Sequence, residues 1–256
     1  MPTLALIDWL LLGGITLLAG MVQTATGFGF GLVSVPFFLL VLDSLAAIQI
    51  SIALVFFNGL LVVPRLWAGA RRDLLRRFAL GTLIGLPIGL WAWLNADLLS
   101  IKTTVAALIL ALSLRLVWVQ LAPTQPRPLP GRPPWAGSVG VLSGVMSVSL
   151  AMPGPAVMIY LGQYRLDREI VRSTLVILFV FSYGCSLAVQ ATIGQMSSSS
   201  WLATAVLVPL SILGGWLGHW MSRFLSPTLF RNLVLFTLLA TGCYMLYQSA
   251  VAWELL

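Results

Sequence analysis

Charged residues are scarce in this chain, and so are the side chains that most enzymes use for catalysis. Only 8% of the 256 residues are charged, with seven carboxylates and a single histidine. Since no Asp or Glu falls in the middle of a hydrophobic segment, we expect no acidic dyad, no metal site and no carboxylate-based proton or cation pathway. Cys185 and Cys243 both lie in apolar segments, which leaves no disulfide framework and no Cys/His metal site. The sequence therefore predicts neither an enzyme nor a cofactor.

The chain is instead rich in apolar residues. The chain is 59% hydrophobic and its mean hydropathy is +1.01, which is too apolar for the surface of a soluble domain. Its hydrophobic segments recur along the whole length and are mostly about 20 residues long, enough to cross a bilayer. The net charge of +7 comes from short loops without a recognition motif, so we expect a lipid bilayer and no nucleic acid as partner.

The segments predict an all-α integral membrane protein in two halves. The linker 123–134 holds six of the fourteen prolines and separates an N-terminal repeat, 1–122, from a C-terminal repeat, 135–256. The predicted helices lie at about 3–24, 30–42, 45–67, 74–95, 99–121, 135–150, 155–163, 169–193, 200–224 and 227–252.

Two hydrophobic stretches are broken by glycine and proline at matching places, Gly20 to Pro36 and Gly144 to Pro155. When Gly20 is set over Gly144, Gly29-Phe30-Gly31 falls over Pro153-Gly154-Pro155. A membrane segment leaves its backbone unpaired only where protein or a water-filled cavity covers it. Paired broken helices of this kind point to a binding site near the midplane of a transporter.

Further matches between the halves support a duplication. Gly81, Gly85 and Gly89 lie four residues apart, as do Gly214 and Gly218; such small-residue faces serve either internal helix packing or a dimer interface. The pairs Asn58-Gly59 and Tyr183-Gly184 also correspond.

The basic residues predict that the two repeats have inverted topology. If each broken stretch is a re-entrant hairpin followed by three full spans, all thirteen arginines lie on the cytoplasmic side and only Lys102 lies outside. The linker is then cytoplasmic and both termini are periplasmic. If each broken stretch instead crosses the membrane once, the arginine-bearing loops fall on opposite faces.

The expected binding site lies at the two helix restarts, where backbone N–H groups are free at the positive end of a helix dipole. Side-chain donors on nearby turns would add to them, although the glycines could equally serve packing and the hydroxyls could bond to their own helices. Asn58 and Tyr183, deep in the first full span of each half, either line the substrate path or tie helices together. The candidate residues are Gln23, Thr24, Thr26, Gly27, Gly29, Gly31, Asn58, Ser147, Ser149, Pro153, Gly154 and Tyr183.

These features together resemble the TauE/SafE sulfite exporter family, a group of transporters of the bacterial inner membrane akin to the 4-toluene sulfonate uptake permeases. The resemblance rests on the glycine-rich break before Pro36, its counterpart at Pro153-Gly154-Pro155, the chain length and the two similar halves. It implies secondary transport of small sulfur-containing anions such as sulfite, sulfoacetate or thiosulfate. In this family about eight spans are usually counted, each broken stretch being taken as one.

Our expectation is an alternating-access exporter of a small organic or inorganic sulfur anion, such as sulfite or an organosulfonate, held between the two breaks. The alternatives are a passive anion channel, and an importer of thiosulfate or another small organic anion. Besides the anionic substrate and the bilayer, a coupling proton or sodium ion and a homodimer are the partners that this reading allows.

Overall fold

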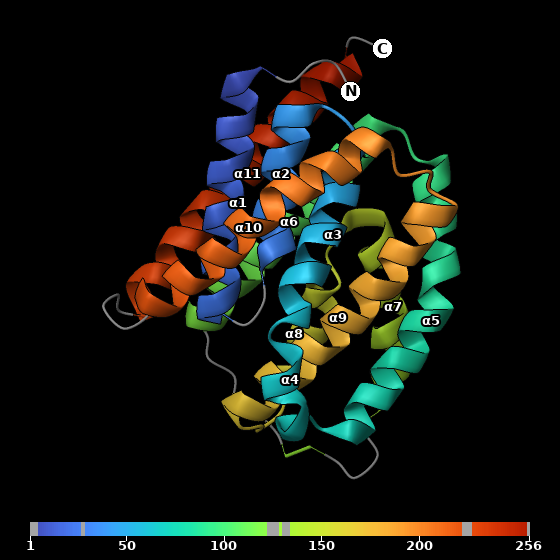
Figure 1. The fold of residues 1–256 in the computed structure, drawn as a ribbon. Helices are drawn as coiled ribbons and strands as arrows, with labels where there is room; N and C mark the ends of the chain where they lie inside the picture. Colours follow the sequence, from blue (N-terminus) through green and yellow to red (C-terminus); the bar gives the residue numbers. More distant parts are fainter. Residues whose placement is uncertain (1–4, 27–28, 122–127, 130–133, 222–226, 255–256) are drawn as a thin grey trace. The chain divides into compact units, whose positions relative to one another are not determined.

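The computed structural model describes residues 5–26, 29–121, 128–129, 134–221 and 227–254, and every regular element in these ranges is helical (Figure 1). Most of the linker 123–134 and the candidate residue Gly27 lie outside the described residues. The elements in chain order are α1 (Leu6–Thr26), α2 (Phe30–Leu42), α3 (Ala46–Leu60), α4 (Val63–Leu66), the 3-10 helix η1 (Trp67–Gly69), α5 (Arg72–Asn95), α6 (Leu98–Leu121), α7 (Ala136–Leu150), α8 (Gly154–Leu161), α9 (Arg168–Thr192), α10 (Ser198–Met221) and α11 (Pro227–Glu254).

Six of these helices are long and apolar enough to cross a membrane: α1, α5, α6, α9, α10 and α11. The bent pair formed by α3 with α4 and η1 would make a seventh. The predicted all-helical membrane protein is thereby confirmed. α1 is long enough to cross by itself, whereas the hairpin interpretation had not counted it among the full spans; α7, at 15 residues, is shorter.

The prediction of one continuous helix over 45–67 is wrong. The helix ends at Leu60, resumes at Val63 and bends by 56° across the break. Pro64 explains the break, because it has no N–H for the carbonyl of Leu60 and its ring would clash with that carbonyl. The chain turns instead, with the N–H of Val62 bonded to the carbonyl of Gly59 at 3.0 Å.

The described helices fall into two compact units, and each unit draws on both halves of the sequence. The first unit contains α1, α2, the start of α3, α6, α11 and α10 from Ala205 onward. The second unit contains the rest of α3, α4, η1, α5, α7, α8, α9 and the start of α10. Within the second unit α9 is central: it contacts α5, α7, α8, α4 and η1.

Glycines allow α5 and α7 to pack backbone to backbone in the second unit, where the two helices run side by side (Figure 1). A Cβ atom on Gly85 would lie 2.1 Å from the carbonyl oxygen of Val141, and one on Gly81 would lie 2.2 Å from that of Gly137. The approach is reciprocal, since a Cβ on Gly144 would lie 2.4 Å from the carbonyl oxygen of Thr82.

The first unit repeats this arrangement between α1 and α10. A Cβ on Gly214 would lie 2.4 Å from the carbonyl oxygen of Leu17, and one on Gly20 would lie 2.7 Å from that of Ser211. Gly218 approaches the backbone of Met21 in the same way. Of the two roles open for the small-residue faces, these contacts support internal packing, because each face is already covered within its own unit.

Candidate functional site

The second break lies between α7 and α8. α7 ends at Leu150, and Ala151 adopts a left-handed conformation with φ 54°. The N–H of Met152 then bonds back to the carbonyl of Met146 at 3.1 Å. A left-handed residue at the end of a helix is usually glycine. Pro153 follows and α8 begins at Gly154.

Two free backbone donors remain at the start of α8. The first turn of a helix has N–H groups without intrahelical partners, but Pro153 and Pro155 carry no N–H. The remaining donors are the amides of Gly154 and Ala156. Gly154 is buried and Ala156 is partly exposed. A ligand could therefore reach these amides from the partly exposed side of the turn, at Ala156.

The carbonyl groups at the break are held by side chains of the same unit. Tyr183 on α9 donates its hydroxyl to the carbonyl of Ala151 at 2.8 Å, and Ser143 on α7 donates to that of Pro153 at 2.9 Å. Both bonds are buried. Of the two roles left open for Tyr183, the tie between helices is therefore the one that the structure contains.

A glutamine pair extends this support to α3. The side-chain amide of Gln190 donates to the carbonyl of Val148 at 3.1 Å, and Gln49 donates to the side-chain oxygen of Gln190 at 3.2 Å. Gln49 also bonds to the carbonyl of Gly194 at 3.1 Å. Sequence reasoning missed Gln49; the available signal was an amide side chain inside an apolar span, which needs a partner.

The two candidate serines of α7 are both hydrogen-bonded. Ser147 shares a hydrogen bond of 2.8 Å with Ser186 on α9. Ser149 donates to the carbonyl of Val145 in its own helix at 2.7 Å, which is the local bonding considered as the alternative. Ser149 is therefore not an unengaged donor.

Ser182 is an unengaged hydroxyl on α9, the helix that contacts both α7 and α8. It is fully buried on α9 and its oxygen has no hydrogen-bond partner among the described atoms. Phe179, three residues earlier and hence on the same side of α9, lies against α8: a Cβ on Gly154 would be 3.2 Å from the tip of its ring. Sequence reasoning missed Ser182, because nothing in the sequence distinguishes it from the paired serines.

The first break belongs to the first unit. Gly29 has φ 104°, a conformation that favours glycine, and precedes α2 as its N-cap. The N–H of Val33 bonds to the carbonyl of Gly29 at 3.1 Å. The amides of residues 30–32, in the first turn of α2, therefore have no intrahelical partner. Gly31 is buried, while Gln23 and Thr24 are half-buried in the last turn of α1; Thr26 ends that helix, and its side chain is outside the described part.

Asn58 lies where α3 and α9 approach closely. It is 9% exposed, and a Cβ on the adjacent Gly59 would lie 2.4 Å from a methyl group of Val180. In return, a Cβ on Gly184 would lie 2.9 Å from the ring of Phe56. Asn58, Ser147, Ser149, Pro153, Gly154 and Tyr183 thus belong to one unit, and Gln23, Thr24, Gly29 and Gly31 to the other.

The hydrogen-bond donors described at the break in the second unit are all neutral groups. The residues named around it are amides, hydroxyls and backbone groups, and the part of the chain that the structure describes contains no group of three or more His, Cys, Asp or Glu side chains placed to hold a metal ion. Such a site can bind an oxyanion through its donors and the helix dipole, and release it without separating an ion pair.

We expect Tyr183→Phe to lower stability, because it leaves the buried carbonyl of Ala151 without its donor at a cost of about 1–3 kcal/mol. The apparent melting temperature of the detergent-purified protein measures this. Ser182→Ala is the matched control on the same turn: it removes a hydroxyl without a partner and should not lower the melting temperature. Equal losses in both variants would contradict the role assigned to Tyr183.

Comparison with known proteins places the chain in a family. No curated protein and no solved structure gives a match. The family model described as Sulfite exporter TauE/SafE matches residues 12–245, which includes both breaks and all six candidate spans in whole or in large part. The chain therefore belongs to the TauE/SafE sulfite exporter family and is a multi-pass membrane transporter, not an enzyme.

Proposed function

We propose that this protein is a secondary transporter, acting as an exporter, of small sulfur-containing organic or inorganic anions such as sulfite or sulfoacetate. The observation that carries the proposal is the restart of α8, where the amides of Gly154 and Ala156 have no intrahelical partner. Ser182, a buried hydroxyl without a partner among the described atoms, lies one turn of α9 after Phe179, whose ring faces Gly154. The proposed substrate uses its sulfur-bound oxygens as acceptors for these donors.

Neutral donors suit a transporter that must release its substrate. A lysine or arginine in a site of low dielectric would hold an anion by several kcal/mol more than a set of neutral donors. Amides at a helix N-terminus supply partial charge that is fixed in direction. The anion can therefore lose its hydration at the site without being bound too tightly to leave.

The two breaks are proposed as equivalent halves of one mechanism with inverted repeats. In support, the first arm of each broken stretch packs through glycines on a full helix of the other half, α1 on α10 and α7 on α5. Gly59 and Gly184, which correspond in the repeat, also contact each other's helices. In this proposal Gly27, Gly29 and Gly31 supply amides at the first break, with Gln23, Thr24 and Thr26 as neighbouring donors. At the second break Gly154 supplies an amide, with Ser147 as a neighbouring donor.

Alternating access follows if one repeat rocks against the other around the bound anion. The side-chain bonds of Tyr183, Ser143 and Gln190 to carbonyls of the second break would let α7, α8 and α9 move as one body. The amides at Gly154 and Ala156 would then keep their geometry while access changes from the cytoplasmic to the periplasmic side of the inner membrane.

Counterflow in proteoliposomes tests this function. Vesicles loaded with unlabelled sulfite or sulfoacetate should accumulate the external radiolabelled anion transiently, with saturable dependence on its concentration. Vesicles loaded with chloride are the control and should not. Uptake that increases linearly with concentration and needs no internal anion would overturn the carrier in favour of a channel.

A further inference from the structure

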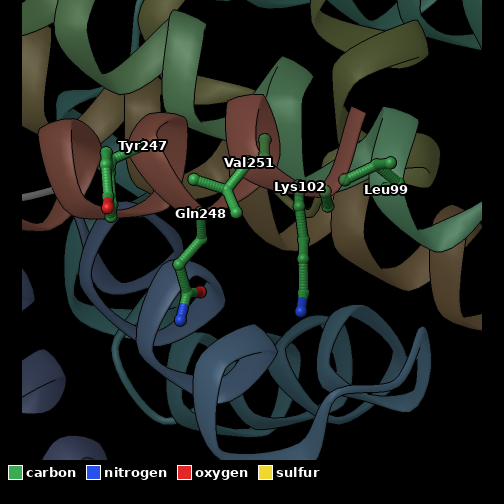
Figure 2. A pocket seen from close by; sticks show the side chains of 7 residues that line it. Leu99, Lys102, Tyr247, Gln248 and Val251 are labelled. Atoms are coloured by element: carbon green, nitrogen blue, oxygen red, sulfur yellow. The ribbon is translucent and has the colours of Figure 1, made fainter. Parts of the chain in front are cut away.

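A second feature of the first unit is a pocket between α6 and α11, remote in sequence from both breaks (Figure 2). Its volume is about 350 Å³. The lining residues are Leu99 and Lys102 from α6, and Tyr247, Gln248, Ser249, Val251 and Ala252 from α11. These residues lie in the first two turns of α6 and the last two turns of α11, so the pocket opens near one end of two antiparallel candidate spans.

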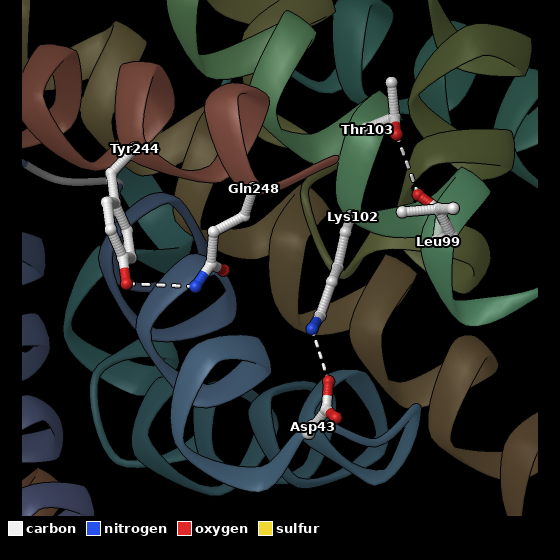
Figure 3. Close-up of polar contacts among 6 residues, drawn as sticks. All are labelled: Asp43, Leu99, Lys102, Thr103, Tyr244 and Gln248. Carbon is white, nitrogen blue, oxygen red and sulfur yellow. Dashed lines mark hydrogen bonds and ion pairs between the residues drawn. The ribbon is translucent and has the colours of Figure 1, made fainter. Parts of the chain in front are cut away.

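Lys102 gives the pocket its charge. It is the only lysine of the chain, and its side chain is 17% exposed. In Figure 2, Lys102 and Gln248 extend from different helices toward the same side. Gln248 donates to the hydroxyl of Tyr244 at 2.9 Å, as Figure 3 shows. A cation and an amide are thus presented together next to an apolar wall.

The partner of Lys102 is an exposed carboxylate. Lys102 forms an ion pair with Asp43 (Figure 3), whose side chain is 72% exposed. A lysine whose side chain is mostly covered is favoured by a nearby counter-charge, whereas a carboxylate in solvent loses little when it is displaced. The pair is therefore asymmetric, and another anion can replace Asp43 at Lys102.

A neighbouring carboxylate is engaged elsewhere. Asp97 precedes α6 and accepts hydrogen bonds from the hydroxyl and the N–H of Ser100. The bond from the Ser100 hydroxyl is the main cause that lowers the pKa of Asp97. Asp97 thus remains ionised as the cap of α6, and Asp43 is the carboxylate that an incoming anion must displace from Lys102.

Ser249 supplies the second indication of a ligand. It is 2% exposed, lines the pocket, and its hydroxyl has no hydrogen-bond partner among the described atoms. A buried hydroxyl without a partner is unfavourable, and a ligand oxygen would relieve this. Most of the remaining lining is apolar: Leu99, Val251, Ala252 and the ring of Tyr247.

The geometry points to a binding site for an organic anion in this pocket, with the acidic group taking the place of Asp43 at Lys102 and the apolar part lying against Leu99 and Val251. The ligand class is a sulfonate, carboxylate or phosphate ester with a hydrocarbon body, rather than a bare inorganic oxyanion. Its source is either a soluble organic anion or the headgroup of an anionic lipid.

Occupancy of this pocket affects α2. Asp43 is the C-cap of α2, and its ion pair with Lys102 ties the end of that helix to α6. The other end of α2 follows the glycine at the first break. An anion at Lys102 thus releases one restraint on the helix that restarts at Gly29. The site is separate from the proposed transport site and does not depend on it.

Calorimetric titration of the detergent-purified protein with butanesulfonate tests the site. Saturable binding should weaken at least tenfold in Lys102→Gln and strengthen severalfold in Asp43→Asn, which removes the competing carboxylate. Arg115→Gln is the matched control, because it removes one positive charge from an exposed position of the same helix and should leave binding unchanged. Equal weakening in Lys102→Gln and Arg115→Gln would overturn the site.

Further arms separate the ligand sources and the two sites. Dihexanoyl phosphatidylglycerol is compared with the corresponding phosphatidylcholine, and preferential binding of the anionic lipid would identify a lipid headgroup as the ligand. If neither phosphatidylglycerol nor butanesulfonate binds, the proposal is overturned.

Val251→Trp, which fills the pocket at a position 39% exposed, should abolish binding in a folded protein. Ala156→Asp acts at the proposed transport site, so the Lys102-dependent binding should persist in it whether or not that function is correct.

Discussion

Ala156→Asp should abolish anion transport while the protein remains folded. The substituted position is in the first turn of α8 and partly exposed, where a carboxylate is favourable for the helix by about 0.3–1 kcal/mol. The same charge would repel an anion bound at these amides. At about 5 Å and an effective dielectric of about 20, the repulsion is about 3 kcal/mol, or roughly a hundredfold in affinity.

Ala156→Asn is the matched control for this experiment. It has the size and hydrogen-bonding groups of the aspartate without the charge, so it should keep a substantial part of the wild-type counterflow. A melting temperature at or above that of the wild type would show that Ala156→Asp is folded. Counterflow that is unchanged in Ala156→Asp, or lost equally in both variants, would count against anion binding at the α8 amides.

The sequence was sufficient to predict where the helices break, because glycine and proline act locally. Pro36 lies inside α2 and does not end that helix. The helix restarts after Gly29 and Pro153 follow from residues that adopt a positive φ or lack an N–H. The break at Pro64 had the same local signal and was overlooked in favour of the apolar run from 45 to 67. The left-handed Ala151 has no such signal, since alanine is an ordinary helix residue.

The long-range part of the site could not be read from the sequence. Tyr183, Ser143 and Gln190 bind carbonyls of the second break, and those partnerships depend on how α7 and α9 pack. Gln49 meets Gln190 across 141 positions of the chain. Ser182 and Ser186 are one helical turn apart, yet only Ser186 has a partner. Such differences arise from tertiary packing and not from residue type.

Gly85→Ala should destabilise the second unit severely, even though alanine is the better helix former. The added Cβ would lie 2.1 Å from the carbonyl oxygen of Val141 and 2.9 Å from the backbone nitrogen of Val145. Backbone atoms of a packed helix cannot rotate away, so α5 and α7 must separate. Overpacking of this kind costs about 1–3 kcal/mol or more, which corresponds to a fall of roughly 2–12 °C in melting temperature for a chain of this size.

Gly137→Ala distinguishes this steric effect from a general requirement for glycine. Gly137 is on the partner helix α7, yet a Cβ there would meet nothing within 4 Å. Its replacement by alanine should therefore stabilise the protein slightly, by about 0.5–1 kcal/mol, through helix propensity alone. Opposite shifts of the melting temperature in the two variants would locate the helix contact at Gly85. A melting temperature that falls equally in both would contradict the packing, because an added Cβ would meet backbone atoms at Gly85 and nothing within 4 Å at Gly137.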